Sequence, residues 1–184
     1  LLLELAVRSR FSASFLGRLS PREIDNAYEV VVGSIPDETG RLLLARLCML
    51  GRIEPESPDR QFIDRSLVDV LRAEHLIGQL ASMSDRFVNR KWQQGIGVVG
   101  VVHAAQLIDA YGLQHSCFSY LQKFGTAANT WLLGEVVSIL SVIGKGRIDY
   151  QGLQLDESYV PLLNLHRKVL TNLVLRNSEI AILD

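Results

Sequence analysis

The alternation of apolar and polar positions predicts helices over most of the first 143 residues. Residues 41–50 show the pattern clearly, because four leucines recur there at helical spacing. These are Leu42, Leu43, Leu47 and Leu50. Gly51 follows where a left-handed C-terminal cap is expected. We therefore predict a buried amphipathic helix that ends at Gly51.

Capping residues mark other helix ends. Ser20 and Glu23 have the spacing of a capping box, with Pro21 at the first helical position, so a helix is predicted from here to Gly33. Its expected buried face consists of Ile24, Ala27, Tyr28 and Val31. Periodicity predicts three more helices over residues 98–110, 113–124 and 126–143, each followed closely by a glycine.

A short hairpin is predicted between the leucine-striped helix and the next one. Pro55 and Pro58 exclude a helix there, and Ile53 and residues 61–63 are short enough to be its two strands. Asp64 is well placed as the N-cap of a helix over residues 65–80. Helix, hairpin and helix together predict a winged-helix domain over residues 1–81, followed by a helical bundle over residues 82–146.

Residues 95–100, Gly-Ile-Gly-Val-Val-Gly, match the glycine pattern of dinucleotide-binding loops. That motif requires a preceding buried strand and an acidic residue about 20 positions later. Residues 89–94 do not have a strand pattern, and residues 115–120 contain no acid. We therefore interpret the glycines as points where a helix packs closely against its neighbour.

The tail has an aliphatic residue at a strict spacing of five. The series is Leu155, Val160, Leu165, Leu170, Leu175 and Ile180. This period resembles that of the pentapeptide-repeat family, which implies a right-handed β-solenoid over residues 147–184 with these side chains inside. The alternative is an amphipathic helix over residues 161–176, which leaves Leu155, Val160, Leu175 and Ile180 unexplained. The expected fold class is thus mainly α, with a winged-helix domain, a helical bundle and a short C-terminal β-solenoid.

Composition is that of an ordinary globular chain. The 184 residues are 48% hydrophobic and carry a formal charge of -1, so no overall charge attracts nucleic acid or an anionic membrane. No segment reaches the roughly 18 to 20 apolar residues of a membrane span, and we expect a cytoplasmic location. Cys48 and Cys117 are predicted to be reduced, buried thiols within helices. The first residue is not methionine, which suggests a piece of a longer protein.

The sequence contains no recognisable catalytic arrangement. His103 and His115 lie on different predicted helices without clustered thiols or carboxylates, so neither is expected to bind a metal. A P-loop is also absent from the sequence. We predict a chain that is not an enzyme, with no catalytic residue, no metal site and no cofactor of its own.

Residues 43–47 (Leu-Leu-Ala-Arg-Leu) and residues 60–71, with Phe62 leading into a helix, resemble the part of a bacterial STAND-type (NACHT) NTPase that follows the nucleotide-binding core. The resemblance implies a non-catalytic regulatory and sensor region of a signalling or antiviral defence switch. Its implied partners are an upstream NTPase core and a protein trigger, and oligomerisation can accompany activation. ATP or ADP would be bound only if an NTPase domain lies upstream.

The same resemblance singles out Asp64, because many such proteins have a histidine at this position that contacts the diphosphate of the bound nucleotide. The alternative function is a winged-helix DNA-binding transcription regulator, which needs a basic recognition helix. The helix expected over residues 65–80 carries Arg65 and Arg72 but also Asp69 and Glu74. Its charge is close to neutral, so nucleic-acid binding is not favoured.

Overall fold

The computed structural model describes residues 1–85, 92–125, 130–143 and 146–184. About 49% of this part of the chain is helical and 19% is in strands. In chain order the elements are α1 (Leu2–Ser9), α2 (Pro21–Val32), α3 (Glu38–Leu44), β1 (Leu50–Arg52), β2 (Arg60–Phe62), α4 (Arg65–Ser82), α5 (Val98–Tyr111), α6 (Gln114–Phe124), α7 (Thr130–Ile143), β3 (Gly146–Asp156), β4 (Tyr159–Val160), β5 (Lys168–Arg176) and β6 (Glu179–Ile180).

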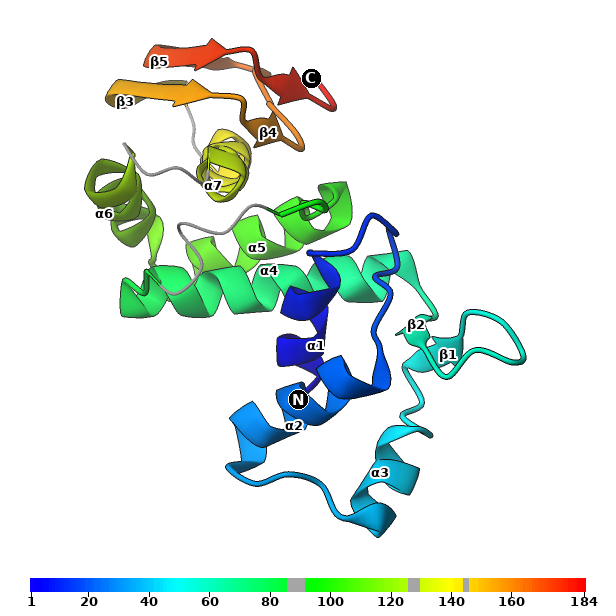
Figure 1. The fold of residues 1–184 in the computed structure, drawn as a ribbon. Coiled ribbons are helices and arrows are strands. Elements are labelled where there is room, and N and C mark those ends of the chain that lie inside the picture. The colour runs from blue at the N-terminus through cyan, green and yellow to red at the C-terminus, as the bar shows by residue number, and fades with distance from the viewer. Residues whose placement is uncertain (86–91, 126–129, 144–145) are drawn as a thin grey trace.

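The long helices α4 and α5 form a central layer of the molecule (Figure 1). On one side lie α1 to α3 and the β1–β2 hairpin, and on the other lie α6, α7 and the strands of the tail. Buried apolar side chains form two clusters. Helix α4 contributes Val68 to the smaller cluster and Leu76 to the larger one, so it belongs to both halves of the core.

The predicted start and end of α2 are confirmed. Ser20 and Glu23 form a complete capping box, and Gly33 closes the helix in a left-handed conformation. The predicted buried face is confirmed for Ile24 and Ala27. It is wrong for Val31, which is 51% exposed, because the last turn of α2 is exposed at Val30, Val31 and Val32 alike.

The predicted helix over residues 41–50 is confirmed for residues 41–44 and wrong for residues 45–50. Asp37 caps an earlier helix by accepting a hydrogen bond from the Gly40 amide at 2.7 Å, and this helix, α3, already ends at Leu44. The chain then turns, so that Leu50 and Gly51 pair in β1 instead of ending a helix. Two of the four stripe leucines, Leu42 and Leu43, are 59% and 67% exposed. Cys48 lies exposed in the turn, whereas the prediction placed it buried in a helix.

The predicted hairpin is confirmed as the antiparallel pair of β1 and β2, in which Leu50 lies opposite Phe62. The side chain of Phe62, the last residue of β2, is fully buried. Helix α4 begins directly afterwards with Asp64 as its N-cap, as predicted. The hairpin therefore leads directly into α4, the longest helix among the described residues.

The helices predicted in the second half are confirmed as α5, α6 and α7, with Gly112 closing α5. Residues 126–129 and Gly144, expected to be the start and the stop of the last helix, lie outside the described residues. Among the described helices, none is both long and apolar enough to span a membrane. The proposed division into residues 1–81, 82–146 and 147–184 stays a prediction.

The predicted fold class is wrong, because the chain is mixed α/β instead of mainly α with a winged-helix domain and a closed solenoid. Helix α3 has seven residues, most of them exposed, and the hairpin strands have three each, which does not make a clear winged-helix domain. Among the described residues, β3 pairs with β5 and β4 pairs with β6, both in parallel. Each tail strand thus has one neighbour within the described part of the chain, and two stacked layers of chain do not close a solenoid. The helical alternative for residues 161–176 is wrong as well, since β5 occupies most of them.

A buried ionic cluster and the cavity beside it

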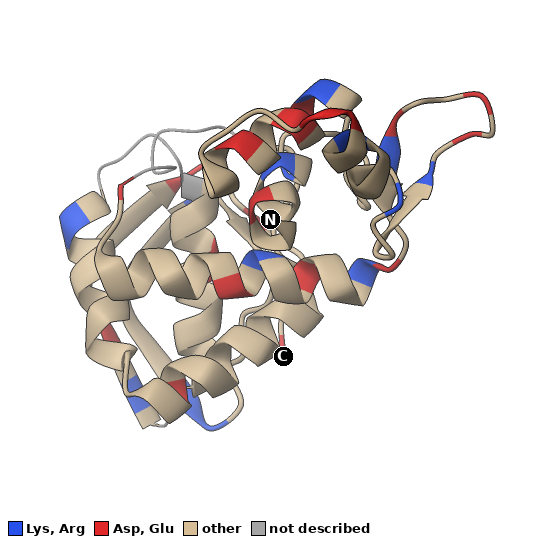
Figure 2. Ribbon diagram, turned by 90° about the horizontal axis from the view of Figure 1, so that it is seen from below, with Lys and Arg blue, Asp and Glu red and all other residues tan. Residues whose placement is uncertain are grey.

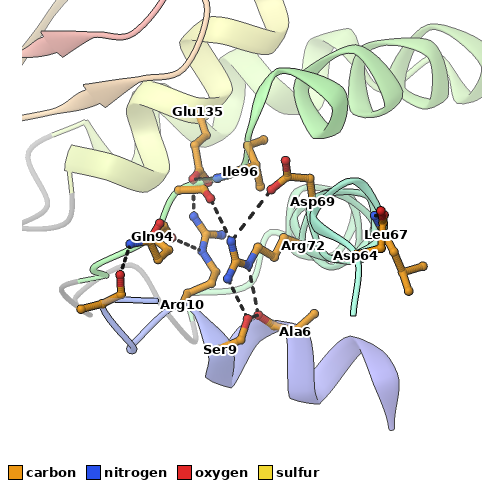
Figure 3. A network of polar contacts seen from close by, with 12 residues as sticks. Ala6, Ser9, Arg10, Asp64, Leu67, Asp69, Arg72, Gln94, Ile96 and Glu135 are labelled. Carbon is orange, nitrogen blue, oxygen red and sulfur yellow. Dashed lines mark hydrogen bonds and ion pairs between the residues drawn. The ribbon is translucent and has the colours of Figure 1, made fainter. Parts of the chain in front are cut away.

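Four ionisable side chains are buried where α1, α4, α7 and residues 92–97 meet (Figure 3). We call them the ionic cluster. They are Arg10, Asp69, Arg72 and Glu135, with exposed fractions of 0%, 4%, 2% and 0%. Charged groups are rarely buried unless they are paired, so the contacts of each one define what this site can do.

Arg10 follows the last turn of α1 and reaches across to α7. Its Nη2 forms a buried ion pair with Oε1 of Glu135, and its Nε donates a hydrogen bond to the Gln94 carbonyl at 3.1 Å. The guanidinium also lies over the ring of Trp92, 3.1 Å from the ring centroid. A planar guanidinium can make a cation–π contact and hydrogen bonds at the same time, which a lysine could not do as well.

Glu135 and Asp69 each accept a hydrogen bond from the segment that leads into α5. The Ile96 amide donates to Oε1 of Glu135 at 2.8 Å, and the Gly97 amide donates to Asp69. These amides lie at the helix N-terminus, where backbone donors have no partner within the helix. The two carboxylates therefore fix the start of α5 between α4 and α7.

Arg72 connects the cluster to α1. Its Nη2 donates to the Ser9 hydroxyl at 2.8 Å and its Nε to the Ala6 carbonyl at 3.4 Å. Its Nη1 lies 3.9 Å from Oδ1 of Asp69, one turn earlier on α4. Arg72 thus connects the end of α1 to the middle of α4.

Burial dominates the electrostatics of all four groups. It lowers the pKa of Arg10 and of Arg72 to about 10 each. It raises the pKa of Asp69 and of Glu135, although Gly97 and the neighbouring arginines favour their charged forms. Within the described residues, Nη1 of Arg10 and Oε2 of Glu135 have no hydrogen-bond partner. Such a cluster adds little net stability but favours one arrangement of the helices that carry it.

The glycine motif belongs to this site as a packing device. A Cβ on Gly95 would lie 2.7 Å from the Tyr159 ring, and one on Gly100 would lie 2.6 Å from the Asp69 carbonyl oxygen. The described residues before the motif form no strand. The interpretation of these glycines as close-packing positions is therefore confirmed.

A cavity of about 280 Å³ opens next to the ionic cluster. Three aromatic side chains line it, Phe15, Trp131 and Tyr159, and the rings of Trp131 and Tyr159 stack with centroids 5.1 Å apart. Arg65 and Glu179 line it as well, together with Asp69 and Arg72 of the cluster. A larger cavity of about 420 Å³ lies between α6 and β3, but Tyr150 is the one ionisable residue in its lining.

The residues predicted from sequence lie elsewhere. Oδ1 of Asp64 accepts a hydrogen bond from the Leu67 amide at 2.7 Å, so this carboxylate caps α4 and takes no part in the cluster (Figure 3). His103 contacts Glu74 at 3.0 Å and His115 contacts Ser119 at 3.4 Å, so the two histidines do not meet. The described part of the chain has no group of three or more metal-ligating side chains placed to hold an ion.

The ionic cluster was not predicted from the sequence, although one sequence feature pointed to it. Glu135 is the sole charged residue between Phe124 and Lys145, within a stretch that is otherwise apolar or small. A lone acid on a buried helix requires a cation or donors from elsewhere in the chain. The sequence does not say which of its 19 basic residues supplies it.

Comparison with known proteins identifies no relative of this chain. No family model, no curated protein and no solved structure matches it. Its function has to be argued from its own residues.

Proposed function

We propose that this chain is a non-catalytic regulatory and sensor region of a STAND (NACHT) NTPase, a switch used in signalling or antiviral defence. In this role it restrains an NTPase core until a trigger is recognised. The observation that supports the proposal most is the ionic cluster, which connects the helix–hairpin–helix unit of the first half to α7. The four residues come from positions 10, 69, 72 and 135, so the cluster forms only when both halves are docked.

A buried ion pair suits a regulatory contact for a physical reason. It contributes little to stability when intact, but separating its partners costs several kcal/mol because each charge is left without compensation. The docked arrangement is therefore sharply defined. A partner that rehydrates or re-pairs these charges can shift the balance to a second arrangement, as a two-state switch requires.

The test begins with the natural reading frame that contains this chain. We expect Walker A and Walker B motifs to be encoded before Leu1, and the protein expressed from that frame to hydrolyse ATP slowly at rest. Glu135→Gln keeps the shape of the side chain but removes its charge, and it should raise the resting rate of hydrolysis. Glu56→Gln, at an exposed position of the β1–β2 hairpin, serves as the control and should change nothing.

Two outcomes would contradict the proposal. One is an upstream frame without nucleotide-binding motifs. The other is an unchanged resting rate in a Glu135→Gln protein whose urea denaturation shows that it is folded.

Binding of duplex DNA, the second candidate, is disfavoured by the burial of Arg72. This arginine is 2% exposed and bonded to Ser9, so it is not available to phosphates. Acidic and basic positions are interspersed along the helices instead of forming one basic face (Figure 2). Titration of duplex DNA at low salt decides the matter, since tight binding that weakens steeply with salt would favour the regulator over the switch.

A further inference from the structure

We propose that the cavity between α4, α7 and β6 binds a small zwitterion with an aromatic body, such as a free aromatic amino acid. The inference goes beyond the regulatory function and does not depend on it. It follows from the presence of two opposite charges and three aromatic side chains in the lining of this one cavity.

The first observation is that Arg65 and Glu179 are available to a ligand. Arg65 is the first residue of α4 and Glu179 begins β6, and both are exposed. Arg65 lies over the Phe15 ring, 4.6 Å from its centroid. Within the described residues, neither Arg65 nor Glu179 takes part in an ion pair with another side chain.

The other two charges in the lining are already engaged. Asp69 accepts from the Gly97 amide, and Arg72 donates to Ser9 and Ala6. An incoming ligand therefore meets one cation, which rests on the Phe15 ring, and one anion, and neither forms an ion pair within the described residues. A ligand that carries a carboxylate and an ammonium group satisfies both, whereas a simple anion or cation leaves one of them unpaired.

The aromatic side chains define the body of the ligand. Phe15, Trp131 and Tyr159 line the cavity together with the two charges, and the electrostatic effects of both charges reach the Tyr159 hydroxyl. Burial raises the pKa of Tyr159, Glu179 raises it further, and Arg65 opposes the shift. An aromatic ring packs well against such faces in offset or edge-to-face geometry.

The size of the cavity indicates the size of the ligand. Cavities that hold drug-sized ligands measure roughly 300 to 1,000 Å³, so a cavity of about 280 Å³ suits a molecule of metabolite size. A single amino acid is of this size.

The experiment titrates the purified chain with L-phenylalanine and measures binding by calorimetry and by tryptophan fluorescence. Three analogues are compared: phenethylamine lacks the carboxylate, 3-phenylpropanoate lacks the ammonium group, and N-acetyl-L-phenylalanine amide lacks both charges. We expect saturable binding of L-phenylalanine, with each analogue weaker by about tenfold or more.

Two variants test which side chain binds the carboxylate of the ligand and which binds its ammonium group. Arg65→Gln should weaken L-phenylalanine about tenfold and leave phenethylamine unchanged. Glu179→Gln should weaken L-phenylalanine similarly and leave 3-phenylpropanoate unchanged. Arg22→Gln and Glu56→Gln, at exposed positions that do not line the cavity, are the matched controls.

Several results would overturn the proposal. One is the absence of saturable L-phenylalanine binding up to its solubility limit. Another is an affinity for the uncharged analogue equal to that for L-phenylalanine. A third is an equal affinity for 3-phenylpropanoate, which would indicate a site for anions only. Unchanged affinity in Arg65→Gln would overturn it too. Because all of these measurements use the chain alone, they are independent of whether an NTPase lies upstream.

Discussion

At the scale of single residues, some charged side chains are buried and some apolar side chains are exposed, the reverse of the usual distribution. Arg10 is fully buried, while Leu43 is 67% exposed. The surroundings explain both. Arg10 contacts Glu135, Trp92 and the Gln94 carbonyl, whereas Leu43 lies on the exposed face of α3 together with Leu42. Burial of a charge is tolerated when an opposite charge and hydrogen bonds compensate it, as Glu135 and the Gln94 carbonyl do for Arg10.

The ion pair of Arg10 and Glu135 yields the first prediction at this scale. Arg10→Met or Glu135→Leu alone should lower the free energy of unfolding by about 3 to 5 kcal/mol, because each leaves one buried charge uncompensated. The double variant should cost much less than the sum of the two single variants. Urea denaturation of the four proteins forms a double-mutant cycle.

An exposed ion pair provides the comparison for this cycle. Arg41 lies 3.1 Å from Asp25 at the surface, and Arg41→Met should cost less than about 1 kcal/mol. Additive effects in the cycle of Arg10 and Glu135 would contradict the role assigned to the ionic cluster.

The two cysteines yield the second prediction. Cys48 is exposed, whereas burial raises the pKa of Cys117 to about 12. Since the thiolate is the reactive form, a thiol reagent at pH 8 should label Cys48 quickly and Cys117 only after unfolding. Cys48→Ser should remove the fast phase and Cys117→Ser should keep it.

The raised pKa of Cys117 also has a consequence for the stability of the fold. Its pKa in the folded chain lies above the ordinary value of 9.0, so its contribution to stability is complete below about pH 9 and is lost as the pH rises through about 12. Rapid labelling of both thiols in the folded protein would contradict the burial of α6.

At the scale of elements, helix α7 holds the second half of the fold together through its packing contacts. It packs against α5, α6, β3 and β4, and it carries Glu135 into the ionic cluster. The contact with β4 is close because Gly134 has no side chain at the place where the Tyr159 backbone crosses α7. The cavity wall formed by Tyr159 therefore depends on a glycine in a helix.

A pair of glycine substitutions tests this contact. Gly134→Ala places a Cβ in a steric clash with the Tyr159 carbonyl oxygen and 3.0 Å from the carbonyl carbon, and we expect a loss of about 1 to 3 kcal/mol of folding free energy. Gly78→Ala, in α4, meets nothing within 4 Å and should stabilise the chain by about 0.5 to 1 kcal/mol. Thermal unfolding of both variants gives the comparison. A stabilising effect of Gly134→Ala would show that β4 does not approach α7 this closely.

At the scale of the whole molecule, stability is distributed unevenly. Helices α4, α5 and α7 form the interior, whereas α3 contributes one buried side chain, Leu44. Several large apolar side chains of α2, α3 and the segment between them are exposed, namely Val30, Val31, Val32, Ile35, Leu42 and Leu43. Parts of a fold with few buried contacts open at lower free energy than the core.

Native-state hydrogen exchange should reveal this order. Amides of α3 are expected to exchange through local opening, while amides in the middle of α4, α5 and α7 exchange near the free energy of global unfolding. Mass spectrometry of peptides from α3 and α5 measures the difference. Equal protection of the two helices would contradict the distribution of packing described above.

The sequence by itself determined the features that depend on neighbours in the chain. The capping box at Ser20, the N-cap at Asp64, the hairpin between Pro-containing turns and the glycine at the end of α5 were all predicted correctly, because each results from hydrogen bonds or sterics within a few residues. The close-packing role of the glycine motif was predicted as well. These interactions are local, so no knowledge of the fold is needed.

Only the tertiary structure decided which periodic positions are buried and which charges meet. Periodicity identifies a face but not its partner, which is why the leucines of residues 41–50 were misjudged and the aliphatic spacing of the tail suggested a closed solenoid. Arg10 and Glu135 lie 125 residues apart, and no local rule relates them. The ionic cluster and the cavity exist because four distant segments pack together, and that packing depends on the whole chain.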